Sequence, residues 1–186
     1  MSSELTGKKI AILVADGFEQ VEMTGPRDAL NGAGAQTFIV SPNPVEVQGM
    51  NHLEKGDMFN VDHCLEAAQA KEYDALLIPG GLANPDELRS TPEAVEFAQH
   101  FLDWDKPIAA ICHGPWVLID AGGVAGKRLT SWPAIQTDVR NAGGDWVDEE
   151  VVVDNHLVTS RSPKDIPAFN KKMIEEFARD PVVLDA

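Results

Sequence analysis

The stretch A-I-C-H-G-P-W, residues 110–116, lies where a buried strand is expected to end and a helix to begin. An apolar run at 107–111 precedes the cysteine, and residues 114–121 have a helical pattern. A nucleophile on so sharp a turn needs small neighbours two positions away on either side, and these are alanine and glycine here. The stretch predicts an α/β fold with Cys112 on a nucleophile elbow, near a helix N-terminus that favours thiolate. The alternative is a buried structural cysteine.

Other apolar runs predict further strands covered on both faces of a sheet. They lie at 9–15, 35–41 and 74–79. Helical patterns lie between and after the strands, so the order predicts a mainly parallel sheet with helices on both faces. Near the end, residues 151–154 and 157–160 flank Asn155-His156, which is typical of a two-residue hairpin turn.

Four helices are predicted besides the one that follows Cys112. Thr24 is expected to cap a helix reaching residue 31 with Pro26 in its first turn, and Asp62 a helix at 64–71. The other two are expected from Thr91-Pro92 to residue 104, and at 166–179.

Length and composition predict a single domain spanning residues 1–186, with a sizeable core. The formal net charge is −15, from 30 acidic and 15 basic residues, which argues against nucleic acid as a primary partner. There is no apolar run long enough to cross a membrane, and the polar N-terminus does not resemble a signal peptide. With only two cysteines and no disulfide framework, we expect a cytoplasmic location.

The carboxyl ends of the predicted parallel strands should bring several polar groups together. Glu19 and Glu22 follow the first strand one helical turn apart, and Gly80-Gly81 follows a later one. A carboxyl group near a thiol can donate a hydrogen bond to the thiolate or act as a general base. The amides of the glycine pair and of His113 suit an oxyanion.

Each of these features also has a purely structural interpretation. The two glutamates fit a solvated first helical turn, the glycine pair fits a tight turn, and His113 fits a structural histidine pointing away from Cys112. The remaining histidines, at positions 52, 63, 100 and 156, are interpreted as structural or surface residues. Cys64 has no partners for a metal set, and residues 121–126 match no dinucleotide or phosphate loop. We therefore expect no metal and no cofactor.

Five motifs in order, D-G-F-E-Q-V-E, L-I-P-G-G, A-I-C-H-G-P, T-S-W and E-V-V-V-D…L-V-T-S-R, make the chain resemble the PfpI intracellular protease family. This family includes stress-induced deglycases and glyoxalases within the class I glutamine amidotransferase-like superfamily. The resemblance runs from Lys8 to about Phe177. It implies a flavodoxin-like three-layer sandwich, with a mainly parallel sheet, helices on both faces and a small C-terminal hairpin.

The resemblance also implies roles for individual residues. Cys112 would be the nucleophile and Glu22 would contact its sulfur, with Glu19 lining the pocket. The amides of Gly81 and His113 would form the oxyanion hole, beside Gly80. Trp116 is expected to wall the cleft together with Trp132.

In the protease-like branch, the histidine pairs with an acidic residue of a neighbouring subunit, and the matching position is Asp86. Aspartate replaces the glutamate of archaeal members and is shorter by one methylene. A site completed in this way implies a homo-oligomer, a dimer or a hexamer.

The resemblance leaves three classes of function open. The first is a glyoxalase or deglycase, in which the cysteine attacks a 2-oxoaldehyde such as methylglyoxal or an early glycation adduct of an amino acid or protein. The second is a cysteine peptidase. The third is a redox sensor or chaperone whose cysteine oxidises without turnover.

Overall fold

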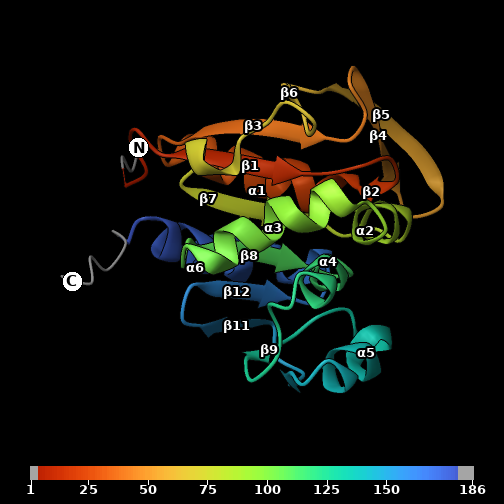
Figure 1. Ribbon diagram of the computed structural model, residues 1–186, viewed down its shortest axis with the longest axis vertical. Helices are drawn as coiled ribbons and strands as arrows, with labels where there is room; N and C mark the ends of the chain where they lie inside the picture. The colour runs from red at the N-terminus through yellow and green to blue at the C-terminus, as the bar shows by residue number, and fades with distance from the viewer. Residues whose placement is uncertain (1–3, 180–186) are drawn as a thin grey trace.

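The computed structural model describes residues 4–179, in which helices cover both faces of a central sheet (Figure 1). Within these residues the sheet contains seven strands. In sheet order they are β11 (Val151–Asp154), β12 (Leu157–Ser160), β8 (Ile108–Ile111), β7 (Ala75–Ile78), β1 (Lys9–Leu13), β3 (Gln36–Ser41) and β6 (His63–Cys64). All pairings are parallel except that of β11 with β12. This order is flavodoxin-like, which confirms the expected fold class. Residues 1–3 and 180–186 of the expected domain lie outside the described residues.

The buried strands point alternate side chains into two cores. In β1, Ile10 and Ile12 belong to the core beneath α1 (Gln20–Gly32) and α6 (Ile166–Phe177). Ala11 and Leu13 belong to the core beneath α3 (Pro92–Asp103) and α4 (Pro115–Asp120). A strand covered on both faces must be apolar throughout, which is why a near-continuous apolar run predicted it. The other predicted strands and the 151–160 hairpin are also confirmed, and the hairpin extends the main sheet.

Helix α1 begins four residues before the expected cap. The Thr24 hydroxyl does not cap the helix but donates to the Gln20 carbonyl oxygen at 3.1 Å. Pro26 lies inside the helix, where it lacks the N–H that would bond to the preceding turn. Burial of Glu22 and Met23 anchors the extra first turn, so tertiary packing overrides the local capping signal.

The prediction of a helix at 64–71 is wrong. Residues His63–Cys64 form β6 and pair with β3, and only a 3-10 turn at Ala70–Glu72 follows. Asp62 does not cap a helix because its Oδ2 accepts a hydrogen bond from the Ile39 amide at 2.7 Å. The backbone is thereby held along the edge of β3.

A second, smaller sheet was not predicted from the sequence. It consists of β2 (Phe18–Glu19), β4 (Glu46–Asn51) and β5 (Glu54–Asn60), and β4 and β5 form a hairpin. The pattern missed it because few residues of β4 and β5 are buried, so these strands leave no apolar run in the sequence. Side-chain amides hold it instead: Gln20 bonds twice to Asp57, each at 2.7 Å, and the Gln48 side chain bonds to three backbone carbonyls.

The remaining elements are short. They are α2 (Ala83–Arg89), α5 (Gln136–Asn141), β9 (Arg128–Leu129), β10 (Asp145–Trp146) and 3-10 turns at Pro133–Ile135 and Pro163–Asp165. In Figure 1, α2 and α4 lie beyond the carboxyl ends of the parallel strands. None of the helices among residues 4–179 has the length and apolarity to span a membrane.

Candidate active site at Cys112

Cys112 occupies the elbow between β8 and α4. Its φ is +61°, a left-handed conformation that side-chain-bearing residues rarely adopt. Its amide donates to the Ser160 carbonyl at 3.0 Å, and its carbonyl accepts from the Trp132 amide at 2.8 Å. A Cβ at Gly114 would lie 2.6 Å from the Ile78 carbonyl oxygen, so only glycine fits there. The predicted elbow is confirmed.

Glu22 is a fully buried carboxyl group in the first turn of α1. Its Oε2 accepts a hydrogen bond from the Gly80 amide at 3.0 Å. The carboxyl also interacts with the Cys112 thiol, and its Oε1 is buried without a hydrogen-bond partner among the described residues. A Cβ at Gly80 would lie 2.4 Å from Oε2 of Glu22 and 2.6 Å from Cβ of Cys112. The glycine therefore permits this close approach.

Burial raises the pKa of Glu22 to about 8. The interaction with Cys112 opposes this rise, the charge of Glu19 adds to it, and the amides of Gly80 and Gly81 oppose it. At neutral pH the Glu22 carboxyl thus holds a proton, in keeping with the predicted role of a carboxyl group beside sulfur.

Burial also raises the pKa of the Cys112 thiol, and the nearby Glu22 carboxylate raises it further. Hydrogen bonds from the amides of Gly81 and His113 oppose this rise without cancelling it. The His113 amide, at the start of the helical turn, thus favours thiolate as expected, but burial outweighs it. Because the thiol and the carboxyl interact, they titrate as one pair. The two amides also converge where an oxyanion hole was expected.

His113 lies against the sulfur and does not point away from it. Its Nδ1 is 3.3 Å from Sγ of Cys112, and its ring lies between Trp116 and Trp132 at centroid distances of 5.1 and 5.9 Å. Burial lowers the pKa of His113, so the imidazole is neutral at pH 7. Within residues 4–179, no carboxylate forms an ion pair with it.

These groups face a cavity of about 240 Å³. It is lined by Glu19, Glu22, His52, Leu53, Gly81, Leu82, Cys112, His113, Trp132 and Pro163. The sequence-predicted residues thus converge, apart from Gly80 just behind the wall, Asp86 and Trp116. His52, interpreted as a structural or surface residue, is an exposed surface residue that also lines this cavity, which its spacing in the sequence did not indicate. The His52 amide donates to Oε2 of Glu19 at 3.1 Å, which holds the β4–β5 hairpin tip at the cavity.

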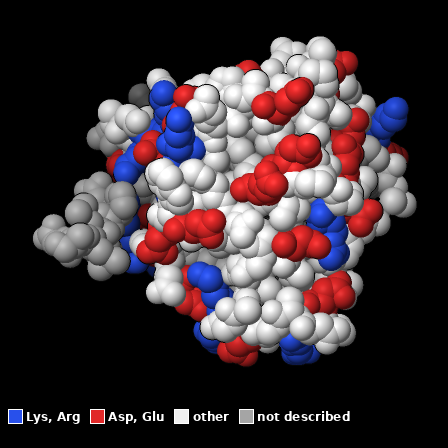
Figure 2. Space-filling model, viewed as in Figure 1, with Lys and Arg blue, Asp and Glu red and all other residues white. Residues whose placement is uncertain are grey.

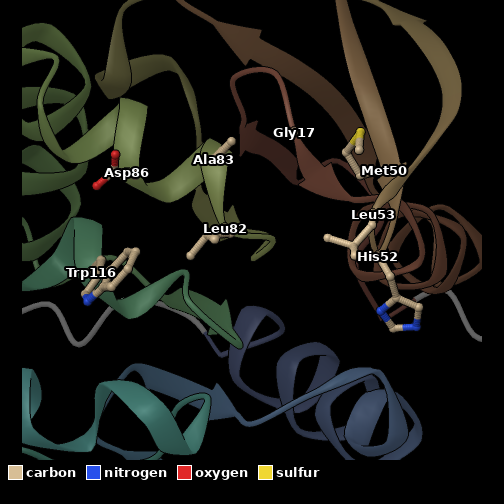
Figure 3. A pocket seen from close by; sticks show the side chains of 8 residues that line it. All are labelled: Gly17, Met50, His52, Leu53, Leu82, Ala83, Asp86 and Trp116. Carbon is tan, nitrogen blue, oxygen red and sulfur yellow. The ribbon is translucent and has the colours of Figure 1, made fainter.

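Asp86 and Trp116 line a neighbouring cavity of about 620 Å³. Figure 3 shows them on one side of it, with Met50, His52 and Leu53 of the hairpin on the other and Leu82 and Ala83 between. Three residues, His52, Leu53 and Leu82, line both cavities. No pattern in the sequence indicated this second cavity, because the β4–β5 hairpin that forms one wall was not predicted.

Comparisons with known proteins agree with this geometry. An uncharacterized protein of Staphylococcus epidermidis is 42% identical over 172 residues, 91% of this chain and 97% of that protein. Among solved structures, Drosophila melanogaster DJ-1beta has a TM-score of 0.84 and 28% identity over 96% of this chain and 91% of its own.

A two-domain protein of Anabaena variabilis, with DJ-1/ThiJ/PfpI-like and ferritin-like domains, has a TM-score of 0.86 and 34% identity. The alignment covers 96% of this chain, which spans about half (52%) of that protein. The model of the DJ-1/PfpI family matches residues 8–176. On this match, together with the elbow cysteine and its buried glutamate, the chain belongs to the DJ-1/PfpI family.

Proposed function

We propose that the protein is a cysteine-dependent glyoxalase or deglycase that acts on 2-oxoaldehydes such as methylglyoxal, or on their early adducts, in protection against carbonyl stress. The family includes cysteine-nucleophile hydrolases and stress-related proteins, which supports the broad class of function. The observation that carries the specific proposal is the pairing of a buried carboxyl, with its pKa raised to about 8, and an elbow cysteine. A proton carrier poised near neutral pH suits transfer between two carbons.

In the first step, the Cys112 sulfur attacks the aldehyde carbon. The thiol proton moves to His113, whose neutral imidazole has Nδ1 3.3 Å from the sulfur. The oxyanion that forms on the aldehyde oxygen accepts hydrogen bonds from the amides of Gly81 and His113, then takes a proton. The product of this step is a hemithioacetal.

In the second step, a base removes the proton on the former aldehyde carbon, and a proton is delivered to the neighbouring keto carbon. Glu22 or His113 carries this proton, and the adduct becomes a thioester of the 2-hydroxy acid. Water then hydrolyses the thioester to lactate and regenerates the thiol. Methylglyoxal plus one water yields lactic acid, so no oxidant or reductant is needed.

The deglycase version starts from a hemithioacetal or hemiaminal on a protein side chain. Transfer of the reacting carbon to the Cys112 sulfur frees that side chain, and the later steps are the same. Removal of free methylglyoxal that equilibrates with such adducts would give the same product.

The test is glutathione-free lactate formation from methylglyoxal by the protein and by its Cys112→Ala variant. Cys64→Ala is the matched control, because it removes the other cysteine, which is not in the Cys112 cavity. We expect lactate from the parent and from Cys64→Ala, and none from Cys112→Ala. Lactate from Cys112→Ala would contradict the proposal. No lactate from any of them would favour a peptidase or a redox sensor.

A further inference from the structure

We propose that the cavity of Figure 3 is a subsite for a basic side chain, arginine or lysine, that neighbours the reacting group in a peptide substrate. This inference rests on the proposed function and deepens it, because it specifies the substrate as an adduct carried by a basic peptide. Its main elements are Leu53 and Leu82, which line both cavities, and Asp86.

The two cavities are continuous in their walls. His52, Leu53 and Leu82 line both, so the second cavity adjoins the one that contains Cys112, and a peptide attached there would have it alongside. Methylglyoxal has five heavy atoms and occupies only a small part of the combined space of about 240 and 620 Å³. Room of this size suits a substrate with a body beyond the reacting aldehyde carbon.

The lining of the second cavity fits a long side chain with an apolar stem and a cationic head. Met50, Leu53, Leu82 and Ala83 offer apolar surface to a methylene chain. The Asp86 carboxylate is exposed, and within residues 4–179 it has no ion-pair or hydrogen-bond partner. A guanidinium or ammonium group would provide one.

The charge around the two cavities also favours a cationic side chain. Among the described residues that line the two cavities, Glu19 and Asp86 are acidic, Glu22 holds a proton at neutral pH, and none is lysine or arginine. Arg89 lies over the ring of the lining residue Trp116 at 5.2 Å, but it forms an ion pair with Asp120 at 2.8 Å. The chain as a whole carries −15, and Figure 2 shows acidic groups spread over the visible face. An anionic peptide is disfavoured on both counts.

The hairpin wall of the cavity is preformed. Gln20 clamps Asp57 through two hydrogen bonds of 2.7 Å, and Glu19 holds the His52 amide at 3.1 Å. Leu53 is 95% exposed and yet fixed at its backbone between these contacts. An exposed hydrophobic side chain that lines the cavity of Cys112 is positioned to contact substrate.

The experiment measures alkylation of Cys112 by three matched reagents: bromoacetyl-arginine amide, bromoacetyl-glutamine amide and bromoacetyl-glutamate amide. In each, the sulfur displaces bromide at the same carbon, so the rates differ only through the side chain. Each rate is divided by the rate with iodoacetamide, and labelling of Cys112 is read by mass spectrometry. This readout does not require turnover of methylglyoxal.

We expect the order arginine, glutamine, glutamate, with an arginine preference that weakens in salt. Asp86→Asn should lower the arginine-to-glutamine ratio by about two- to fivefold, the size of a partly exposed ion pair. Asp103→Asn is the control, since it makes the same charge change at the C-terminal end of α3. Because the readout is a ratio, a general change in Cys112 reactivity does not affect it.

Equal normalised rates for the three reagents would overturn the subsite, as would equal effects of Asp86→Asn and Asp103→Asn. A second copy of the chain in this cavity would overturn it too. In that case Leu53→Ser would convert an oligomer to a smaller species by sedimentation and would speed labelling by all three reagents alike. If the parent forms no lactate but the arginine reagent still labels Cys112 fastest, the proposed function is rejected and the subsite is not.

Discussion

The side chains of Glu22 and Cys112 both pack against the backbone of Gly80, where a Cβ would lie within 2.6 Å of each of them. One carboxylate oxygen is fixed by the Gly80 amide, and the carboxyl and the thiol are both buried. Burial is the main reason that the pKa values of both groups are raised, and a charged Glu22 carboxylate raises the pKa of the thiol further. The protonation state of this pair is therefore the property whose measurement tests the site most directly.

The pH dependence of Cys112 alkylation should report the pair. Below about pH 8 both groups hold protons, and above it the pair loses one. We expect the iodoacetamide rate to rise through about pH 8, because the two amides stabilise the fraction of the pair with charge on sulfur. Glu22→Gln should abolish this step, since an amide does not titrate. If the alkylation rate rises with the same pH midpoint in the parent and in Glu22→Gln, Glu22 is not the titrating group.

The same carboxyl should make stability depend on pH. Its pKa rises from 4.5 to about 8 on folding, so its contribution is full below pH 4.5 and is lost as the pH rises through 8. At ~1.4 kcal/mol per unit, the loss is on the order of 5 kcal/mol. Glu22→Gln lacks this loss, so its urea stability relative to the parent should increase between pH 5 and 8. The matched control is Glu96→Gln, which makes the same substitution on the exposed face of α3.

Gly80→Ala should disable the site. The added methyl group would lie 2.4 Å from the Glu22 carboxylate and 2.6 Å from Cys112, so one of them must move. We expect lactate formation and the alkylation step near pH 8 to be lost, with a stability cost of about 1–3 kcal/mol. Gly32→Ala in α1 is the control, because its Cβ would meet nothing within 4 Å. Equal activity of the two variants would contradict this account of Gly80.

Gln20→Ala should loosen the β4–β5 hairpin. It removes both hydrogen bonds to Asp57 while leaving α1 with a good helix former. We expect faster amide hydrogen exchange at 49–57, together with a smaller arginine preference in the labelling assay. Gln99→Ala, an exposed change on α3, provides the comparison. Unchanged exchange in the hairpin would show that other contacts hold it.

The sequence predicted the central sheet well because its strands are buried on both faces, and burial leaves an apolar run in the chain. It predicted the elbow because a residue with φ of +61° needs small neighbours, and glycine at 114 is visible in the sequence. The convergence of Glu22, Gly80 and Cys112 followed from the rule that parallel strands place their carboxyl ends together.

The failures have a common physical origin in tertiary contacts. The polar β4–β5 hairpin depends on the amide of Gln20, far away in sequence, and His52 and Leu53 reach the site only through it. Asp62 was expected to cap a helix, but its carboxylate accepts a hydrogen bond from a backbone amide of β3. The cavity beside Asp86 arises between segments separated in sequence, so no local pattern reports it.

The left-handed backbone at Cys112 has a consequence for how this protein is built. A residue with a Cβ in that conformation costs about 1–2 kcal/mol, and glycine does not incur this cost. Replacing Cys112 by glycine should therefore leave a more stable protein than replacing it by alanine, the reverse of the usual order in a buried position. The protein is therefore less stable than its fold allows, and the cause is the backbone conformation of the residue that the proposed chemistry requires.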